Sequence, residues 1–149
     1  MTLTDAELAQ ALTDLKYLPV QKIANAEKEA KRDHVSLYEK IVQKDYLNED
    51  ELGKVIAYHF QLPYISLTSS NIASPILHLL PKQVAETYQT VPFELDDEGL
   101  HIATTQPDAK DLFAMLAKKA GAKAYKVSYT SQSSIKAALY LYKIGRAHV

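Results

Sequence analysis

The hydrophobic pattern changes its period near residue 61, and this change constrains the fold more than any other feature of the chain. Before it, apolar residues recur at the spacing of amphipathic helices, whereas after it short alternating runs are separated by Pro, Gly and acidic turns. With 149 residues and 47% hydrophobic composition, the chain can bury a small helical bundle beside one compact α+β unit. We therefore predict an α+β fold, with a helical hairpin region over residues 1–60 and an α+β domain over residues 61–143.

Four short helices are predicted in the first region because each has a typical start. Thr4 and Glu7 have the spacing of a capping box, in which two otherwise unpaired backbone amides are satisfied, and the same spacing recurs from Ser36 and from Asn48. Pro19 suits the first turn of the remaining helix, because the amide hydrogen that proline lacks is not needed there.

The helical region also contains an approximate internal repeat. Residues 12–23 and 41–52 share the order of an apolar helix end, a polar turn, an apolar pair, a polar or acidic first turn and an apolar stripe. Two packed helical hairpins explain this repeat without any ligand.

The second region is predicted to form a small antiparallel sheet of three or four strands with helices packed on one face. The strands are expected at residues 62–67, 90–95, 100–104 and 123–129, and the helices at residues 74–80, 81–88, 106–120 and 131–142. Residues 96–99 suit a reversing turn, Pro92 indicates an edge position or a bulge, and Gly121 is placed to end a helix.

The residues expected to matter most are structural. The core is predicted to contain Leu52, Ile56, Ile102, Leu112, Leu116, Val127, Ile135 and Leu139. Element boundaries are expected at Pro81, Pro92 and Pro107.

Composition excludes several classes of function. The formal charge of -1 arises from interleaved acids and bases, which argues against nucleic acid or anionic lipid as the main partner. The chain has no cysteine, so it has no disulfide, thiolate metal site or cysteine nucleophile, and it fits a reducing compartment. The apolar runs are too short to span a membrane and the start lacks a signal core, so we predict a cytoplasmic protein without direct membrane insertion.

No catalytic, cofactor-binding or metal-binding residue is predicted. The sequence contains no P-loop, no dinucleotide fingerprint and no Gly-x-Ser-x-Gly elbow, so the chain is not expected to be an enzyme. The widely spaced histidines lack the helical pairing of a zinc site, and we expect them at the surface or at the boundary of the core: His34, His59, His78 and His101.

Tyrosine is frequent, with 10 residues in the chain. Four of these gather near the end of the chain, at Tyr125, Tyr129, Tyr140 and Tyr142. Tyrosine serves a protein interface and a half-buried sheet face equally well. The interface interpretation requires two or more of the four to lie exposed in one contiguous patch.

A set of short segments in a fixed order resembles the amino-terminal domain of the type II secretion and type IV pilus assembly ATPases across residues 1–143. These segments are LPYISL from Leu62, LPKQVA from Leu80, VPFEL from Val91 and LHIATTQPD from Leu100. The resemblance implies a non-catalytic α+β module that precedes a second domain and a hexameric, P-loop-containing motor.

The resemblance also implies the partners. The module would couple the motor to an inner-membrane platform or adaptor protein, and it would lie at the inner membrane only through those partners. ATP and Mg would belong to the missing motor domain, and this chain would hold no cofactor. The alternative is a free-standing regulatory protein with the same fold.

Some members of this family bind cyclic di-GMP through the helical half, using two copies of a motif that begins Arg-Leu-Gly and reaches a Gly-containing turn. Here the first copy falls on Glu7-Leu8-Ala9 with Lys16 at the turn, and the second on Ser36-Leu37-Tyr38 with Asp45 at the turn. Both arginines, which would supply planar donor forks, and the glycines of both copies are therefore replaced. We expect no cyclic di-GMP binding, and we keep nucleotide sensing as the alternative.

The last six residues, 144–149, resemble one translated reading frame of a widely used DNA sequencing adapter. We therefore expect a non-native tail that follows the native domain. An ordinary frayed helix end is the alternative.

Overall fold

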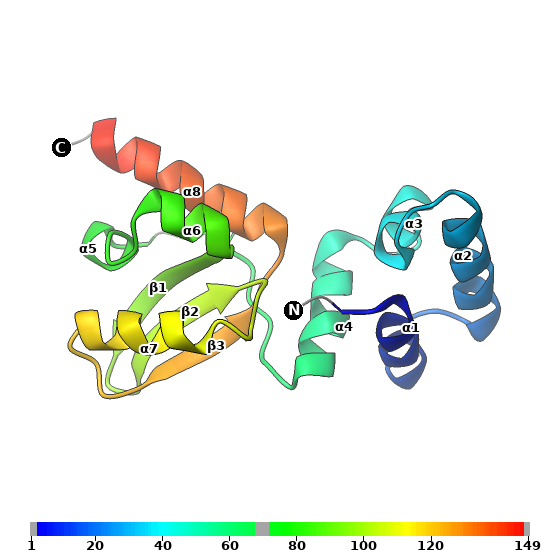
Figure 1. Ribbon diagram of the computed structural model, residues 1–149, viewed down its shortest axis with the longest axis horizontal. Helices are drawn as coiled ribbons and strands as arrows, with labels where there is room; N and C mark the ends of the chain where they lie inside the picture. Colours follow the sequence, from blue (N-terminus) through cyan, green and yellow to red (C-terminus); the bar gives the residue numbers. More distant parts are fainter. Residues whose placement is uncertain (1–2, 68–71, 148–149) are drawn as a thin grey trace. The chain divides into compact units, whose positions relative to one another are not determined.

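The computed structural model describes residues 3–67 and 72–147, which fall into two compact units that divide between Gln61 and Leu62 (Figure 1). The first unit is all helical and contains α1 (Asp5–Asp14), α2 (Val20–Arg32), α3 (Leu37–Gln43) and α4 (Glu49–Phe60). The second contains α5 (Ser74–Leu77), α6 (Lys82–Tyr88), β1 (Thr90–Asp96), β2 (Gly99–Thr104), α7 (Lys110–Lys119), β3 (Tyr125–Tyr129) and α8 (Gln132–Ala147). The predicted α+β class is confirmed.

The helices of the first unit begin where the capping residues predict. Thr4 Oγ1 accepts a hydrogen bond from the amide of Glu7 at 3.1 Å, and the Glu7 carboxylate accepts from the amide of Thr4 at 3.0 Å. Asn48 and Glu51 form the same reciprocal pair ahead of α4. Ser36 caps α3 through a single bond from the amide of Glu39. Each cap satisfies backbone donors that the first helical turn leaves unpaired.

The core of the helical unit is closed. Helix α1 contacts each of the other three helices. The side chains that fill the space between them are less than one tenth exposed: Leu8, Leu12, Leu18, Ile23, Leu37, Ile41, Leu47, Leu52, Val55 and Ile56. These short helices are too short to be stable alone, so this shared burial holds them together.

The sheet of the second unit has the strand order β1-β2-β3 and is mixed. Strand β1 pairs antiparallel with β2, but β3 pairs parallel with β2. The prediction of an antiparallel sheet is therefore wrong for β3. The physical reason is α7, which carries the chain back along the sheet between β2 and β3 and so brings β3 in with the same direction as β2.

Residues 62–67 do not form the strand that the sequence predicts. The segment makes one isolated parallel bridge, between Tyr64 and Tyr129, in which the amide of Ile65 donates to Tyr129 O at 3.0 Å. The next acceptor, Ile65 O, receives its hydrogen bond from the Thr130 hydroxyl at 2.6 Å. A longer strand would have a bond from a backbone amide at this place. The sheet thus has three strands in the described residues, and residues 68–71 lie outside them.

The β1–β2 hairpin has the irregularity that Pro92 predicts. The register shifts between Pro92 and Glu94, as expected for a proline on an edge strand that cannot complete the ladder. At the start of β2, Gly99 has φ +127, and a Cβ built there would lie 2.2 Å from Ala124 O. Only glycine therefore fits the close approach of β2 to the chain ahead of β3.

The central strand, β2, is buried on both faces at its carboxyl end. Leu100 and Ile102 face the same side as their in-register partners Tyr125 and Val127 on β3, and α7 lies on this side because its Phe113 ring is 5.8 Å from Tyr125. Ala103 points to the opposite side and is also fully buried. Helices α5, α6 and α8 contact β1, whereas α7 contacts β2 and β3 (Figure 1).

The predicted core residues occupy the interior of their units. Leu52, Ile56, Ile102, Leu116 and Ile135 are buried, and three further residues are partly buried against the second core: Leu112, Val127 and Leu139. Helix α7 begins at Lys110, a short turn after the predicted start at residues 106–108. Gly121 has φ +72 just beyond α7 and ends it as predicted.

The four tyrosines near the end of the chain do not form an exposed patch. Tyr140 is 59% exposed, Tyr125 and Tyr129 are half-buried, and Tyr142 is 2% exposed. The Tyr142 hydroxyl donates to Leu77 O at 2.9 Å and to Leu80 O at 2.6 Å, and burial raises its pKa to about 12. The interface interpretation of this cluster is therefore wrong, because alternate positions of a strand and a helix face in different directions.

Helix α8 continues past residue 143 as far as Ala147, so the first residues of the expected tail are helical. The origin of residues 144–149 stays a prediction, and the last two residues lie outside the described ranges. Within those ranges, no helix has the length and apolar character that crossing a bilayer requires.

Removing the Tyr142 hydroxyl should destabilise the second unit. Tyr142→Phe removes the side-chain donor to Leu80 O and to Leu77 O, of which Leu77 O keeps a backbone donor in the amide of Leu80. The substitution should therefore lower the free energy of unfolding by about 1–2 kcal/mol. Tyr140→Phe on the same helix is the matched control, because an exposed hydroxyl should change it by less than about 0.5 kcal/mol. Urea denaturation of the three proteins measures the difference, and equal midpoints for both variants would contradict the assignment.

Candidate functional site

An internal repeat with a fixed offset of 29 residues relates α1 to α3 and α2 to α4. The buried positions match pairwise along the repeat: Leu8 and Leu37, Leu12 and Ile41, Leu18 and Leu47, and Ile23 and Leu52. Each copy therefore packs its helical hairpin with side chains at equivalent places. The approximate sequence repeat therefore corresponds to two helical hairpins, α1–α2 and α3–α4, with equivalent buried positions.

The two repeats share an unusual backbone turn. Lys16 after α1 and Asp45 after α3 both have φ +57, in the left-handed region that glycine adopts most readily. The turn is closed in the same way in each copy, because the amide of Tyr17 donates to Leu12 O at 3.2 Å and the amide of Tyr46 donates to Ile41 O at 3.1 Å. These are the positions at which the family resemblance places the turn glycines, and here a lysine and an aspartate adopt the left-handed conformation.

The positions that correspond to the motif arginines serve as helix caps instead. Glu7 completes the capping box of α1, and Ser36 caps α3. Hydrogen bonds from the backbone and side chain of Thr4, and then the nearby His59, lower the pKa of the Glu7 carboxyl. The first position therefore carries a negative charge that repels phosphate, and the second offers a single hydroxyl in place of a guanidinium fork.

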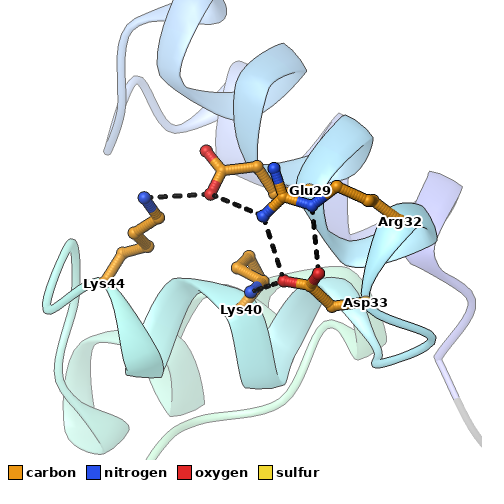
Figure 2. Close-up of polar contacts among 5 residues, drawn as sticks. All are labelled: Glu29, Arg32, Asp33, Lys40 and Lys44. Atoms are coloured by element: carbon orange, nitrogen blue, oxygen red, sulfur yellow. Dashed lines mark hydrogen bonds and ion pairs between the residues drawn. The ribbon is translucent and has the colours of Figure 1, made fainter.

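A charge network joins the end of α2 to α3 beside the second turn (Figure 2). Arg32 binds Asp33 through two parallel bonds, Nε to Oδ1 at 3.0 Å and Nη2 to Oδ2 at 3.2 Å. The Lys40 ammonium lies 2.5 Å from Asp33 Oδ2, and the Lys44 ammonium lies 2.9 Å from Glu29 Oε2. Each cation of the network, Arg32, Lys40 and Lys44, is therefore paired with a carboxylate of the same unit.

Asp33 is the centre of this network. Hydrogen bonds from Arg32 and then from Lys40 hold the pKa of its carboxyl well below the usual range. The Lys40 side chain is only 8% exposed, so its ammonium depends on this partner, whereas Lys44 is 41% exposed and can be hydrated. The network therefore acts mainly as a clamp between α2 and α3, and it leaves no arginine fork open for a nucleotide phosphate among the described side chains.

The second unit has a shallow depression between the end of α6 and the start of α7. It is lined by Tyr88, Asp108, Ala109, Lys110, Asp111, Leu112 and Met115. Tyr88 is 43% exposed and Met115 is 50% exposed. Its lining mixes apolar side chains with charged ones, as surfaces that contact other proteins commonly do.

The four histidines within the described residues lie at the surface or at the boundary of the core, as predicted. His59 Nε2 is 3.5 Å from Glu7 Oε2 and His101 Nε2 is 2.9 Å from Asp96 Oδ2, so two of them have carboxylate partners. The second pair could not be predicted from helical spacing, because Asp96 and His101 lie on paired strands. The signal was present in the hairpin, since a turn over residues 96–99 brings Asp96 and His101 close together.

Comparison with known protein families identifies the family. Residues 60–146 match the model of the MshEN domain, and the chain therefore belongs to the MshEN domain family. It is also similar to the type IV pilus assembly ATPase PilB of Thermus thermophilus, with 29% identity over 99 residues that cover 66% of this chain and 11% of the relative. PilB of Myxococcus xanthus is 24% identical over 108 residues, which cover 72% of this chain and 19% of the relative.

The chain spans less than a fifth of the length of these two relatives. A solved structure of MshE with cdg has a similar fold, with a TM-score of 0.65 and 20% identity over 91% of this chain and 97% of that one. The predicted resemblance to the amino-terminal domain of pilus and secretion ATPases is confirmed.

Removing the charge of Asp33 should weaken the helical unit. Asp33→Asn leaves the buried Lys40 ammonium without its counter-ion, so the melting temperature at pH 7 should fall. Glu29→Gln is the matched control, because its partner Lys44 is 41% exposed and can be hydrated, so the loss of this pair should matter less. Thermal denaturation followed by circular dichroism measures both, and equal effects would contradict the central role of Asp33.

The same substitution has a defined pH dependence. The folded state lowers the pKa of Asp33, so the stabilisation is present above the unfolded pKa of about 3.9 and is lost as the pH falls below it. The difference in melting temperature between the unsubstituted chain and Asp33→Asn should therefore become smaller as the pH falls below about 3.9.

Proposed function

We propose that the chain is a non-catalytic interaction domain of a type IV pilus assembly or type II secretion ATPase, and that it couples the motor to an inner-membrane platform or adaptor protein. The observation that carries this proposal is the match of residues 60–146 to the MshEN domain, together with relatives of which this chain covers only a small part. In this proposal the parent is a hexamer, its motor domain binds ATP and Mg, and the domain is cytoplasmic, reaching the membrane only through its partner.

The internal bonding of the second unit supports a coupling role. The segment that enters this unit is tied down at two points, because Thr130 Oγ1 donates to Ile65 O at 2.6 Å and the amide of Leu67 donates to Ser134 Oγ at 2.8 Å. A segment bonded in this way moves together with the sheet and α8. Such a body can transmit position to a partner that binds its surface.

The depression beside α7 is the contact surface that we propose for the partner. Met115 at its edge is 50% exposed, although it lies on a helix whose other face is buried through Phe113 and Leu116. An exposed methionine on a rigid helix supplies the adaptable apolar contact that protein interfaces favour.

Biosensor measurements test this function. The binding partners to use are the cytoplasmic domains of the platform and adaptor proteins that are encoded near the same gene. We expect saturable binding, and we expect Met115→Glu to weaken it by at least about tenfold because a charge then enters the apolar contact. Val20→Glu is the matched control, since Val20 is 68% exposed on the other unit. Absence of binding to every such protein would contradict the coupling role, and equal effects of the two substitutions would contradict the chosen surface.

Cyclic di-GMP sensing is the second candidate function. The left-handed turns at Lys16 and Asp45 favour it, as does the similar fold of MshE, whose structure contains cdg. Glu7 and Ser36 oppose it because both are used in helix caps and neither supplies a guanidinium. We therefore place this function behind coupling.

Calorimetric titration decides between the two. We expect no saturable binding of cyclic di-GMP at concentrations up to about 100 µM, which corresponds to less than about 5.5 kcal/mol of binding free energy. The MshE domain is the positive control for the ligand and the assay. Binding that is lost on Lys16→Ala or Leu37→Ala would support nucleotide sensing instead.

A further inference from the structure

The β1–β2 hairpin carries three side chains of metal-binding type on one face. Glu94 lies directly opposite His101 in the strand register, and Asp96 follows Glu94 by two residues and so shares its face. One ligand atom from each of Glu94, Asp96 and His101 lies within 4.8 Å of the other two. This separation allows one ion to reach all three after small changes of side-chain torsion.

The hairpin holds His101 in place before any ion binds. The neighbours of His101 on β2, Leu100 and Ile102, are fully buried, which anchors the strand beneath it. The imidazole itself is only 20% exposed, its ring centre is 5.9 Å from that of Phe93, and its Nε2 is 2.9 Å from Asp96 Oδ2. A site built on paired strands loses little conformational freedom when a ligand binds.

The chemistry of the donors selects the kind of ion. One imidazole nitrogen with two carboxylate oxygens suits a borderline transition-metal ion, whereas Mg²⁺ and Ca²⁺ favour oxygen donors throughout. We propose that Glu94, Asp96 and His101 form a binding site for a divalent transition-metal ion such as Zn²⁺, with water in the remaining coordination positions. This site is independent of the proposed coupling function.

The surrounding charges favour a cation. Asp97 and Glu98 follow directly in the turn and add negative charge. A basic group, Lys126 on β3, lies opposite His101 in the register, but its ammonium is bonded to the Glu98 carboxylate. The Lys126 charge is thus largely balanced, and the face retains net negative charge.

The test is calorimetric titration of Zn²⁺ into the full chain at pH 7, with NMR detection of the His101 ring. We expect saturable binding tighter than about 100 µM. We expect His101→Ala and Glu94→Gln each to weaken it by at least about tenfold. His34→Asn is the matched control and should leave the affinity unchanged, because His34 lies in the other unit and asparagine tolerates its φ of 56.

A parallel titration with Mg²⁺ separates a specific site from attraction to acidic groups. Much weaker binding of Mg²⁺ than of Zn²⁺, together with a Zn²⁺-dependent shift of the His101 signals, would support the site. Equal affinities for the two ions, no saturable Zn²⁺ binding, or Zn²⁺ binding that survives both hairpin substitutions would overturn it. Glu94→Gln keeps the test valid if His101→Ala disturbs the hairpin, because Glu94 is exposed.

Discussion

The pairing of β2 with a neighbour on each side is the constraint on which the second unit depends. Its residues Leu100, Ile102, Ala103 and Thr104 are all fully buried, so apolar groups must cover both faces of this strand. The two neighbours arrive in opposite ways, β1 through a tight turn and β3 through the α7 crossover. That crossover places α7 on the face of Leu100 and Ile102, and the remaining helices gather around β1.

In the helical unit, helix caps are made at the two positions where the family resemblance places the arginines of the cyclic di-GMP motif. Glu7 and Ser36 each satisfy an amide at a helix start, and Arg32 is held by the Asp33 carboxylate. The turns at Lys16 and Asp45 keep the left-handed geometry although a non-glycine residue is less favourable there. Packing of the repeated leucines and isoleucines therefore preserves the two hairpins, while Glu7 and Ser36 stand where the family resemblance places arginines.

The features that could be predicted from the sequence depend on neighbouring residues. Thr4, Ser36 and Asn48 mark helix starts, and Gly121 marks a helix end, because caps are made within a few residues. The direction of β3 could not be predicted in this way, since its pairing with β2 is set across the whole α7 crossover. The role of Tyr142 depends in the same way on carbonyls more than 60 residues away in the chain.

The buried and the exposed side chains therefore have different roles. Every buried side-chain nitrogen or oxygen in the described residues has a hydrogen-bond partner, so the cores contain no polar group that still requires a ligand. Any specific recognition by these residues must then arise where side chains extend from backbone that the fold fixes and still reach solvent. Met115 beside the depression and His101 on the hairpin meet both conditions, because each extends from an element whose other face is buried. The packed cores hold the backbone that carries these two side chains, so a partner or ion that binds them would not first have to order that backbone.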